Sequence, residues 1–115
     1  MGRILLLEDD DEVRSVLCQA VEGHGHDVKP VANCADAYAA LKEEKFDLLL
    51  SDVRLPDGSG HEVAAHAKST GTPALLISAY ADEFKNTNPD QAIVFPKPSR
   101  LDPIVRAIDG ILLRR

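Results

Sequence analysis

Short apolar runs alternate with amphipathic segments along the chain. The predicted strands occupy residues 4–7, 28–31, 46–51, 74–77 and 92–95, and all of them are mainly apolar runs except 28–31, which contains Lys29 and Pro30. Continuous apolar runs of this length are typical of strands in a parallel sheet that is covered on both faces. Between the first two runs, apolar residues recur at helical spacing at Val13, Val16, Leu17, Ala20 and Val21. The pattern therefore predicts strands and helices in alternation.

Capping residues mark where the predicted helices begin and end. Asp10 or Asp11 can cap the first helix, because a carboxylate accepts hydrogen bonds from the free N–H groups of the first turn. Gly23 follows the last apolar position of that helix and is expected to end it. Asn33 is placed to cap the second helix. Pro103 is compatible with the last helix because it falls in the first turn.

Five strands that alternate with helices across short loops predict an α/β protein. We expect a flavodoxin-like (βα)5 fold, a doubly wound parallel sheet with strand order 2-1-3-4-5. Lys29 and Pro30 suit the sheet edge at which this order puts the second strand. Residues 1–115 are expected to form a single domain. The poor helix sequence at residues 86–90 predicts a shortened or irregular fourth helix.

The composition excludes several classes of function. The chain has 115 residues, of which 44% are hydrophobic, and a formal net charge of −6. No run of Lys or Arg is longer than two residues, which argues against a nucleic-acid-binding surface. No apolar stretch approaches the roughly 20 residues of a membrane span, and no signal peptide is visible, so a cytoplasmic protein is expected. Cys18 and Cys34 should stay reduced, because the topology puts them on opposite faces of the sheet.

Four kinds of polar group follow the apolar runs. The acidic pair Glu8-Asp9 follows the first run, Asp52 the third and Ser78 the fourth, whereas Lys97 stands between two prolines after the fifth. Ligands of such sheets bind in the crevice beyond the carboxyl ends of the strands, so these groups are expected at one site. Carboxylates about 4 Å apart repel by about 4 kcal/mol at an effective dielectric near 20. Protonation or a bound cation can offset this repulsion, and hard oxygen ligands favour Mg²⁺ together with a phosphoryl group.

Several of the polar residues near the strand ends have a simpler explanation when each is considered alone. Asp10 and Asp11 suit the acidic first turn of a helix, where anions are stabilised. Ser78 alone would be an ordinary serine at a strand end, and Lys97 alone a solvated surface lysine. The functional interpretation depends on the combination of these groups at matching strand ends.

Over its whole length, the chain resembles the receiver domain of two-component response regulators. The resemblance lies in residues 4–10 (ILLLEDD), 47–60 (DLLLSDVRLPDGSG), 76–79 (LISA) and 95–98 (FPKP). The second stretch is highly specific. This resemblance implies that Asp52 is the phosphoacceptor, that Asp9 ligates Mg²⁺ directly and that Glu8 does so through water. The backbone carbonyl of Arg54 would be a further protein ligand.

The resemblance also implies a switch and not an enzyme. Asp52 would accept a phosphoryl group from a sensor histidine kinase or a histidine phosphotransfer protein, while Mg²⁺ and Lys97 neutralise charge on the transferred oxygens. Ser78 would bond one phosphoryl oxygen after its loop moves inward. The switch would change the binding of a downstream protein, with the chain a monomer or weak homodimer. Met1 directly before the first strand favours a stand-alone receiver.

The chain departs from the receiver pattern in the region before Lys97. Receivers usually carry Tyr or Phe three residues before this lysine, where the chain has Val94. The neighbouring Phe95 points to the other side of its strand. The usual aromatic switch is therefore expected to be absent, with Tyr80 as a candidate replacement. The segment between Ser78 and Lys97 is also shorter than usual, so a remodelled partner surface is expected there.

Other interpretations of the same residues stay open. A Mg²⁺-dependent phosphatase of the haloacid-dehalogenase type needs an acid two residues after its nucleophile, where this chain has Arg54. The Arg54 side chain would either alter the lifetime of the phosphorylated form or be an ordinary surface residue. A receiver-like interaction module that is never phosphorylated would tolerate Val94. His24 and His26 would form a metal site only with further ligands nearby.

Overall fold

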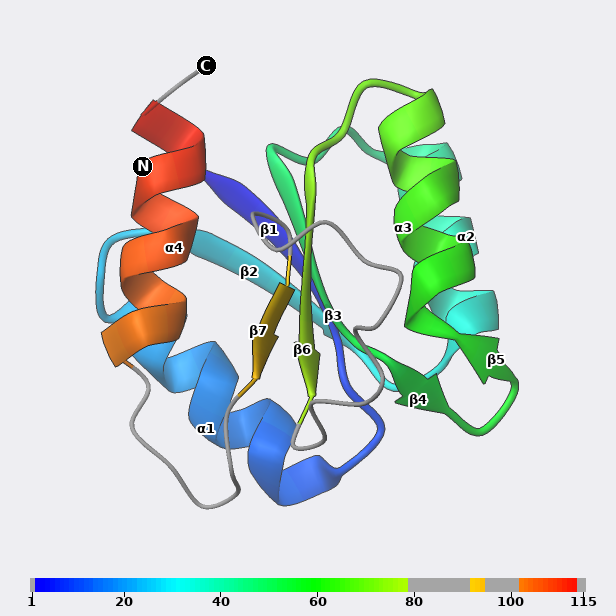
Figure 1. Cartoon of the computed structure of the whole chain (residues 1–115), viewed down its shortest axis with the longest axis horizontal. Coiled ribbons are helices and arrows are strands. Elements are labelled where there is room, and N and C mark those ends of the chain that lie inside the picture. The colour runs from blue at the N-terminus through cyan, green and yellow to red at the C-terminus, as the bar shows by residue number, and fades with distance from the viewer. Residues whose placement is uncertain (1, 79–91, 95–101, 114–115) are drawn as a thin grey trace.

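A parallel sheet forms the centre of the molecule. The computed structural model describes residues 2–78, 92–94 and 102–113. Its sheet contains β1 (Arg3–Leu7), β2 (Asp27–Val31), β3 (Leu48–Asp52), β6 (Ala74–Ser78) and β7 (Ala92–Val94). All neighbouring strands are parallel, in the order β2-β1-β3-β6-β7 (Figure 1). This order is the predicted 2-1-3-4-5 arrangement, so the predicted fold class is confirmed.

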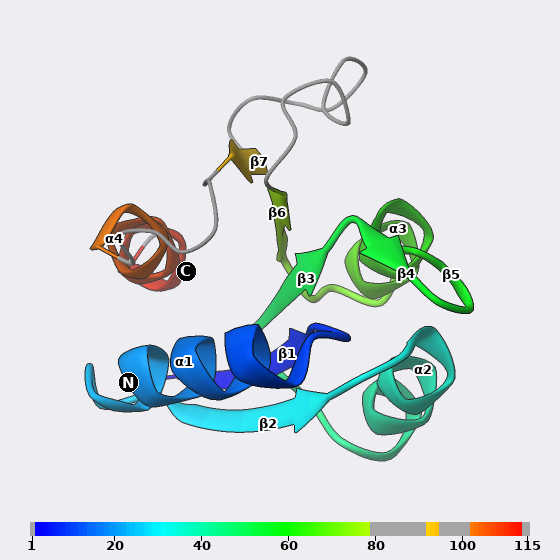
Figure 2. The ribbon, with the colours of Figure 1, turned by 90° about the horizontal axis from the view of Figure 1, so that it is seen from below.

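Helices cover both faces of this sheet. They are α1 (Asp11–Glu22), α2 (Cys34–Glu43), α3 (Gly60–Ser69) and α4 (Asp102–Leu113). Figure 2 shows α1 and α4 on one face of the sheet and α2 and α3 on the other. The helix α4 is the predicted last helix, with Pro103 in its first turn as expected. The predicted short fourth helix falls within residues 79–91, which lie outside the described residues.

The apolar residues of the strands divide between two cores. Leu5 and Leu7 pack with α2 and α3, whereas Ile4 and Leu6 pack with α1 and α4. All four side chains are completely buried, because successive residues of a strand point to opposite faces and both faces are covered. A shift of one residue in the strand pairing would move each of these side chains to the opposite face of the sheet. The apolar pattern therefore specifies the pairing register strongly.

Side-chain caps begin three of the helices. The Asp10 carboxylate accepts a hydrogen bond from the N–H of Val13 at 3.0 Å, so Asp10 and not Asp11 caps α1. The Asn33 side chain accepts from the N–H of Asp36 at 2.8 Å, as predicted for α2. Ser59 caps α3. Each cap supplies a hydrogen-bond acceptor that an N–H group of the first turn would otherwise lack.

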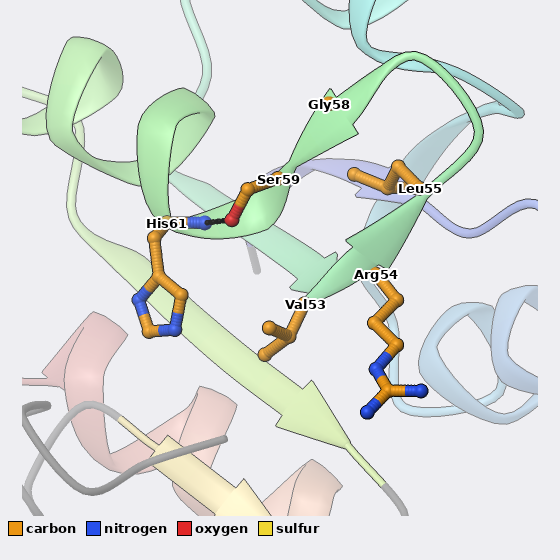
Figure 3. Close-up of a pocket in the computed structure, with 6 residues that line it drawn as sticks. All are labelled: Val53, Arg54, Leu55, Gly58, Ser59 and His61. Atoms are coloured by element: carbon orange, nitrogen blue, oxygen red, sulfur yellow. Dashed lines mark hydrogen bonds between the residues drawn. The ribbon is translucent and has the colours of Figure 1, made fainter.

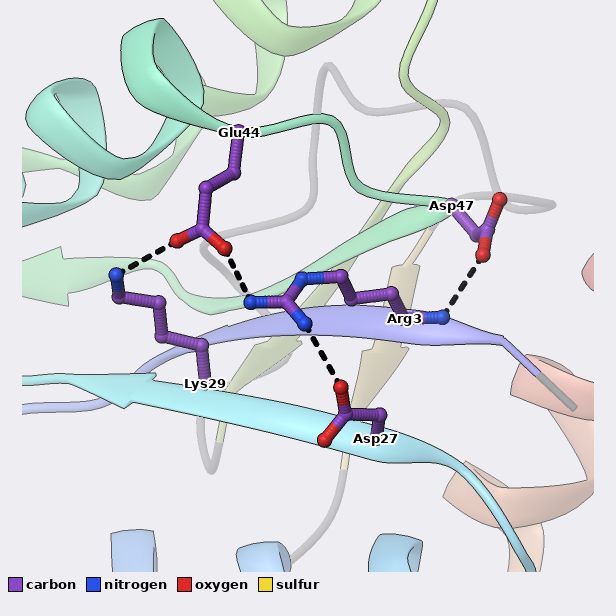
Figure 4. A network of polar contacts seen from close by, with 5 residues as sticks. All are labelled: Arg3, Asp27, Lys29, Glu44 and Asp47. Carbon is purple, nitrogen blue, oxygen red and sulfur yellow. Dashed lines mark hydrogen bonds and ion pairs between the residues drawn. The ribbon is translucent and has the colours of Figure 1, made fainter.

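A polar network joins the amino-terminal ends of the strands to the end of α2 (Figure 4). The Arg3 guanidinium pairs with Asp27 at 2.8 Å and with Glu44, and Lys29 pairs with Glu44 at 2.7 Å. The Asp47 carboxylate accepts a hydrogen bond from the Arg3 N–H at 2.8 Å. The hydrogen bond from Lys29, with added attraction from Arg3, lowers the pKa of the Glu44 carboxyl. This network lies at the edge of the sheet opposite the carboxyl ends of the strands.

His26 has a structural position that the sequence did not indicate. Its side chain is buried, and its Nδ1 accepts a hydrogen bond from the Gly2 N–H at 3.0 Å. Its Nε2 lies 2.8 Å from the Asp109 carboxylate, whereas His24 approaches that carboxylate only to 4.0 Å. Because Nδ1 accepts, Nε2 carries the proton and donates to Asp109. His26 thus ties α4 to the start of β1.

The two cysteines lie on opposite faces of the sheet, as predicted. Cys34 is buried in the core under α2 and α3, and Cys18 packs against the other core. Both are free thiols. Among the described helices, none has the length and apolar character needed to cross a membrane.

Candidate functional site

Three carboxylates meet where β1 and β3 end. Glu8 and Asp9 follow β1 directly, and Asp52 is the last residue of β3. The two strands are adjacent, with Leu7 paired to Ser51. Glu8, Asp9 and Asp52 each offer a carboxylate oxygen within 4.8 Å of the others. Their positions at neighbouring strand ends predicted this cluster.

The cluster concentrates negative charge in a partly enclosed place. Glu8 is completely buried and Asp52 is 8% exposed, whereas Asp9 is exposed. Two unit charges 4.8 Å apart repel by about 3.5 kcal/mol at an effective dielectric near 20. A hard divalent cation would remove this repulsion, and the exposed side leaves room for the water ligands that Mg²⁺ retains. The donor set therefore fits Mg²⁺.

Hydrogen bonds hold the acidic pair in its loop. The Glu8 carboxylate accepts from the N–H of Asp10 at 3.1 Å, and the Glu8 N–H donates to the Val31 carbonyl at 3.1 Å. The Arg14 guanidinium reaches back from α1 and donates to the Glu8 carbonyl at 3.0 Å. Arg14 thereby fixes the backbone of the loop.

Asp52 is held by the residue on each side of it. Its Oδ1 accepts a hydrogen bond from the N–H of Val53 at 2.8 Å. The Ser51 hydroxyl donates to the Asp52 carbonyl at 2.8 Å. The Val53 carbonyl accepts from the N–H of Gly60 at 2.7 Å, which joins the end of β3 to the start of α3. The carboxylate therefore projects from a backbone with little freedom to move.

Gly60 lies closer to the backbone of Asp52 than any side chain would allow. A Cβ at this position would lie 2.0 Å from the Asp52 carbonyl oxygen and 2.9 Å from the Ser51 hydroxyl oxygen. Only glycine permits this approach. Gly60 ends the stretch of residues 47–60 that carries the family resemblance, but its role in shaping the site follows from the packing of α3 against β3.

A hairpin separates Asp52 from α3. It consists of β4 (Arg54–Leu55) and β5 (Gly58–Ser59), paired antiparallel with Arg54 opposite Ser59. A shallow hollow of about 490 Å³ lies beside it. Figure 3 shows the side chains of Arg54, Val53 and His61 on the same side of the hairpin. Arg54 and His61 thus bring a guanidinium and an imidazole to this hollow.

Ser78 is a further predicted site residue, and it lies in the other half of the sheet. Ser78 ends β6, one residue beyond Ile77, which pairs with Asp52. The neighbouring strand β7 pairs its last residue, Val94, with Ser78. Lys97 and Tyr80 lie outside the described residues. The register therefore brings Ser78 to the same end of the sheet as the acidic cluster.

The fold and the acidic strand ends match a known class of signalling module. The family model for the response regulator receiver domain matches residues 4–109. The chain belongs to this family. Receiver domains are parts of two-component signalling systems and act as signalling modules.

Relatives and solved structures agree with this assignment. The chain is 36% identical to the response regulator receiver protein CpdR of Brucella abortus, with 98% of each chain covered. It is 33% identical to the transcriptional regulatory protein AfsQ1 of Streptomyces coelicolor, of which it spans 51%. A response regulator receiver protein from Sinorhizobium medicae has a similar structure, with a TM-score of 0.84, 26% identity and coverage of 96% of this chain and 94% of that one. The fold also resembles TrrA of Thermotoga maritima in complex with Mg²⁺ and BeF, with a TM-score of 0.81, 23% identity and coverage of 96% and 99%.

Proposed function

We propose that the chain is a cytoplasmic receiver that is phosphorylated on Asp52 by a sensor histidine kinase or a histidine phosphotransfer protein. The observation that supports this most directly is the cluster of three carboxylates at the carboxyl ends of β1 and β3. Glu8, Asp9, Asp52 and the backbone carbonyl of Arg54 would hold the Mg²⁺ ion. The bound ion would supply positive charge that stabilises the oxygens of the transferred phosphoryl group.

The Asp52 carboxylate is the nucleophile of the proposed reaction. One of its oxygens forms a bond to phosphorus while the phosphorus–nitrogen bond of the donor phosphohistidine breaks, and the imidazole leaves. The hydrogen bond from Val53 orients the carboxylate for in-line attack. Ser78 and Lys97 contact the phosphoryl oxygens, by the roles that the family resemblance assigns to them. The product is an acyl phosphate, which water later hydrolyses.

The phosphoryl group changes the balance between two conformations. It adds roughly −1.5 to −2 charges and three acceptor oxygens at the carboxyl edge of the sheet. A conformation in which Ser78 bonds one of these oxygens is favoured only in the phosphorylated form. This difference would change the affinity for a downstream protein or for a second copy of the chain.

Intact mass measurement tests the proposal. The wild-type protein is incubated with a small phosphodonor such as acetyl phosphate and Mg²⁺, and a gain of one phosphoryl group is expected. Asp52→Asn and removal of Mg²⁺ by a chelator should each abolish the gain. A wild-type protein that folds, binds Mg²⁺ and still gains no phosphoryl group from this donor or from a histidine kinase would contradict the proposal.

An unphosphorylated interaction module is the second candidate, and the replacement of the usual aromatic by Val94 favours it. This candidate predicts no phosphoryl gain in the same experiment and a partner affinity that Asp52→Asn does not change. A further variant, Arg54→Ala, tests the hollow beside the hairpin. A changed dephosphorylation rate is expected if the guanidinium lies near the phosphoryl group, and an unchanged rate would make Arg54 a surface residue.

A further inference from the structure

The tip of the β4–β5 hairpin is bound to the start of α2 through Asp57. One carboxylate oxygen of Asp57 accepts a hydrogen bond from the N–H of Cys34 at 2.8 Å, and the other accepts from the N–H of Ala35 at 3.0 Å. Asp57 thus makes two hydrogen bonds with the first turn of a helix that begins 23 residues earlier in the chain.

The charge of Asp57 suits this position. Asn33 already accepts the hydrogen bond of Asp36, so Asp57 satisfies the two first-turn N–H groups that Asn33 does not reach. An anion at a helix amino terminus is stabilised by the helix dipole. The hydrogen bonds from Cys34 and Ala35 lower the pKa of the Asp57 carboxyl. The group therefore stays ionised at neutral pH and keeps both oxygens as acceptors.

Packing supports the same attachment. A Cβ at Gly58 would lie 3.2 Å from the Cys34 sulfur, so the hairpin backbone is in close contact with α2. Cys34 is itself buried in the core that includes Val53, and Leu55 of the hairpin packs against this core. The hairpin tip is consequently held by hydrogen bonds and by contact with a buried side chain.

The hairpin is also fixed at its base. Arg54 pairs with Ser59, and the Gly60 N–H donates to the Val53 carbonyl at 2.7 Å. Arg54 therefore lies between two anchors, the start of α3 at one end of the hairpin and Asp57 at the other. Removing the Asp57 side chain would leave the hairpin held by its base and by packing, without the two hydrogen bonds to α2.

We propose that Asp57 is a positioning residue of the phosphorylation site, which holds the hairpin against α2 so that the backbone carbonyl of Arg54 faces the bound Mg²⁺. This inference rests on the function proposed above, because the carbonyl is a ligand only if the acidic cluster binds the ion. Residues that orient metal ligands commonly change metal affinity by 10- to 100-fold when they are substituted. Asp57 should therefore affect the affinity for Mg²⁺ more than the rate at saturating Mg²⁺.

The test compares Asp57→Ala with Asn33→Ala. Both variants remove an acceptor from the amino terminus of α2, but only the first removes the hydrogen bonds between the hairpin and α2. The dissociation constant for Mg²⁺ is measured by calorimetric titration, and the phosphorylation rate with acetyl phosphate is measured across Mg²⁺ concentrations. Thermal unfolding of both variants shows how far each loses stability. Asp57→Asn, which keeps one carbonyl oxygen as an acceptor, serves as the conservative variant.

Asp57→Ala should raise the Mg²⁺ dissociation constant by about 10-fold or more, with a smaller change in the rate at saturating Mg²⁺. Asn33→Ala should stay within about twofold of wild type, and Asp57→Asn should lie between them. Equal Mg²⁺ affinities in Asp57→Ala and Asn33→Ala would overturn the inference. If Asp57→Ala does not fold, a wild-type affinity in Asp57→Asn would overturn it instead. Failure of the wild type to bind Mg²⁺ or to be phosphorylated would refute the proposed function, which is a separate result.

Discussion

Substitution of Gly60 by alanine tests how the packing of α3 shapes the phosphorylation site. The added Cβ would lie 2.0 Å from the carbonyl oxygen of Asp52 and 2.9 Å from its carbonyl carbon. These neighbours are backbone atoms, so they cannot rotate away as the end of a flexible side chain would. Either the end of β3 or the first turn of α3 must shift.

The size of the shift follows from the contact distance. A Cβ essentially never lies within 3.0 Å of such an atom, so the 2.0 Å separation requires a movement of about 1 Å. Overpacking of this kind costs about 1–3 kcal/mol of folding stability. A displacement of about 1 Å in a reacting group can lower a rate by about 100-fold. We therefore expect Gly60→Ala to fold with reduced stability and to be phosphorylated about 100-fold more slowly.

The assay measures stability by urea denaturation and phosphorylation by intact mass at saturating Mg²⁺. Gly25→Ala is the matched control, because Gly25 has φ of +90° and no heavy atom within 4 Å of the added Cβ. That variant should lose about 1 kcal/mol through its backbone conformation and keep the wild-type rate within about twofold. A folded Gly60→Ala protein with the wild-type phosphorylation rate would show that the close approach does not position Asp52.

Three further predictions concern groups away from the acidic cluster. His26→Ala should lower the free energy of unfolding by about 1–3 kcal/mol in urea denaturation, because it leaves the Gly2 N–H without its buried partner; an unchanged midpoint would contradict this. Hydrogen bonds from the backbone N–H groups of Cys34 and Ala35 lower the pKa of the Asp57 carboxyl in the folded chain. Its stabilisation is therefore present above the pKa of the unfolded chain, which is about 3.9, and is lost as pH falls through the folded value. The difference in urea midpoint between wild type and Asp57→Asn should therefore be constant from pH 7 to about pH 5 and shrink below about pH 4, whereas a difference independent of pH would refute the assignment. Burial and Glu22 raise the pKa of the Cys18 thiol to about 11, so its alkylation by iodoacetamide at pH 8 should be about 100-fold slower than in the urea-unfolded chain, and equal rates would be inconsistent with the structure.

Elements with a local signal were predicted correctly. Apolar runs marked four of the five strands of the sheet, because a strand buried on both faces is apolar over most of its length. The edge strand β2 was recognised by Lys29 and Pro30. Asn33 was predicted to cap α2 and does so, since a side-chain cap reaches only two or three residues along the chain. The position of the acidic cluster could also be predicted from the strand pattern. Carboxylates that directly follow neighbouring parallel strands must arrive at one edge of the sheet.

The local sequence did not indicate contacts between segments that are far apart along the chain. His26 and Asp109 are 83 residues apart, and nothing near either residue indicates the buried hydrogen bond that joins them. The strands of the hairpin after Asp52 have two residues each, which is too short for a periodic pattern, and the hairpin was not predicted. Nothing in the sequence distinguishes Asp57 from the other polar residues of this segment. Its attachment to α2 depends on how closely the hairpin and the helix pack.

The sequence by itself determined the alternation of strands and helices, the Asn33 cap of α2 and the meeting of Glu8, Asp9 and Asp52, because each depends on periodicity, on a local hydrogen bond or on position at a strand end. The tertiary structure alone decided that Gly60 must lack a side chain and that Asp57 binds the start of α2. The physical reason is the range of the interactions. Periodic patterns and caps act within one element, whereas close packing is defined only after separate elements have come together.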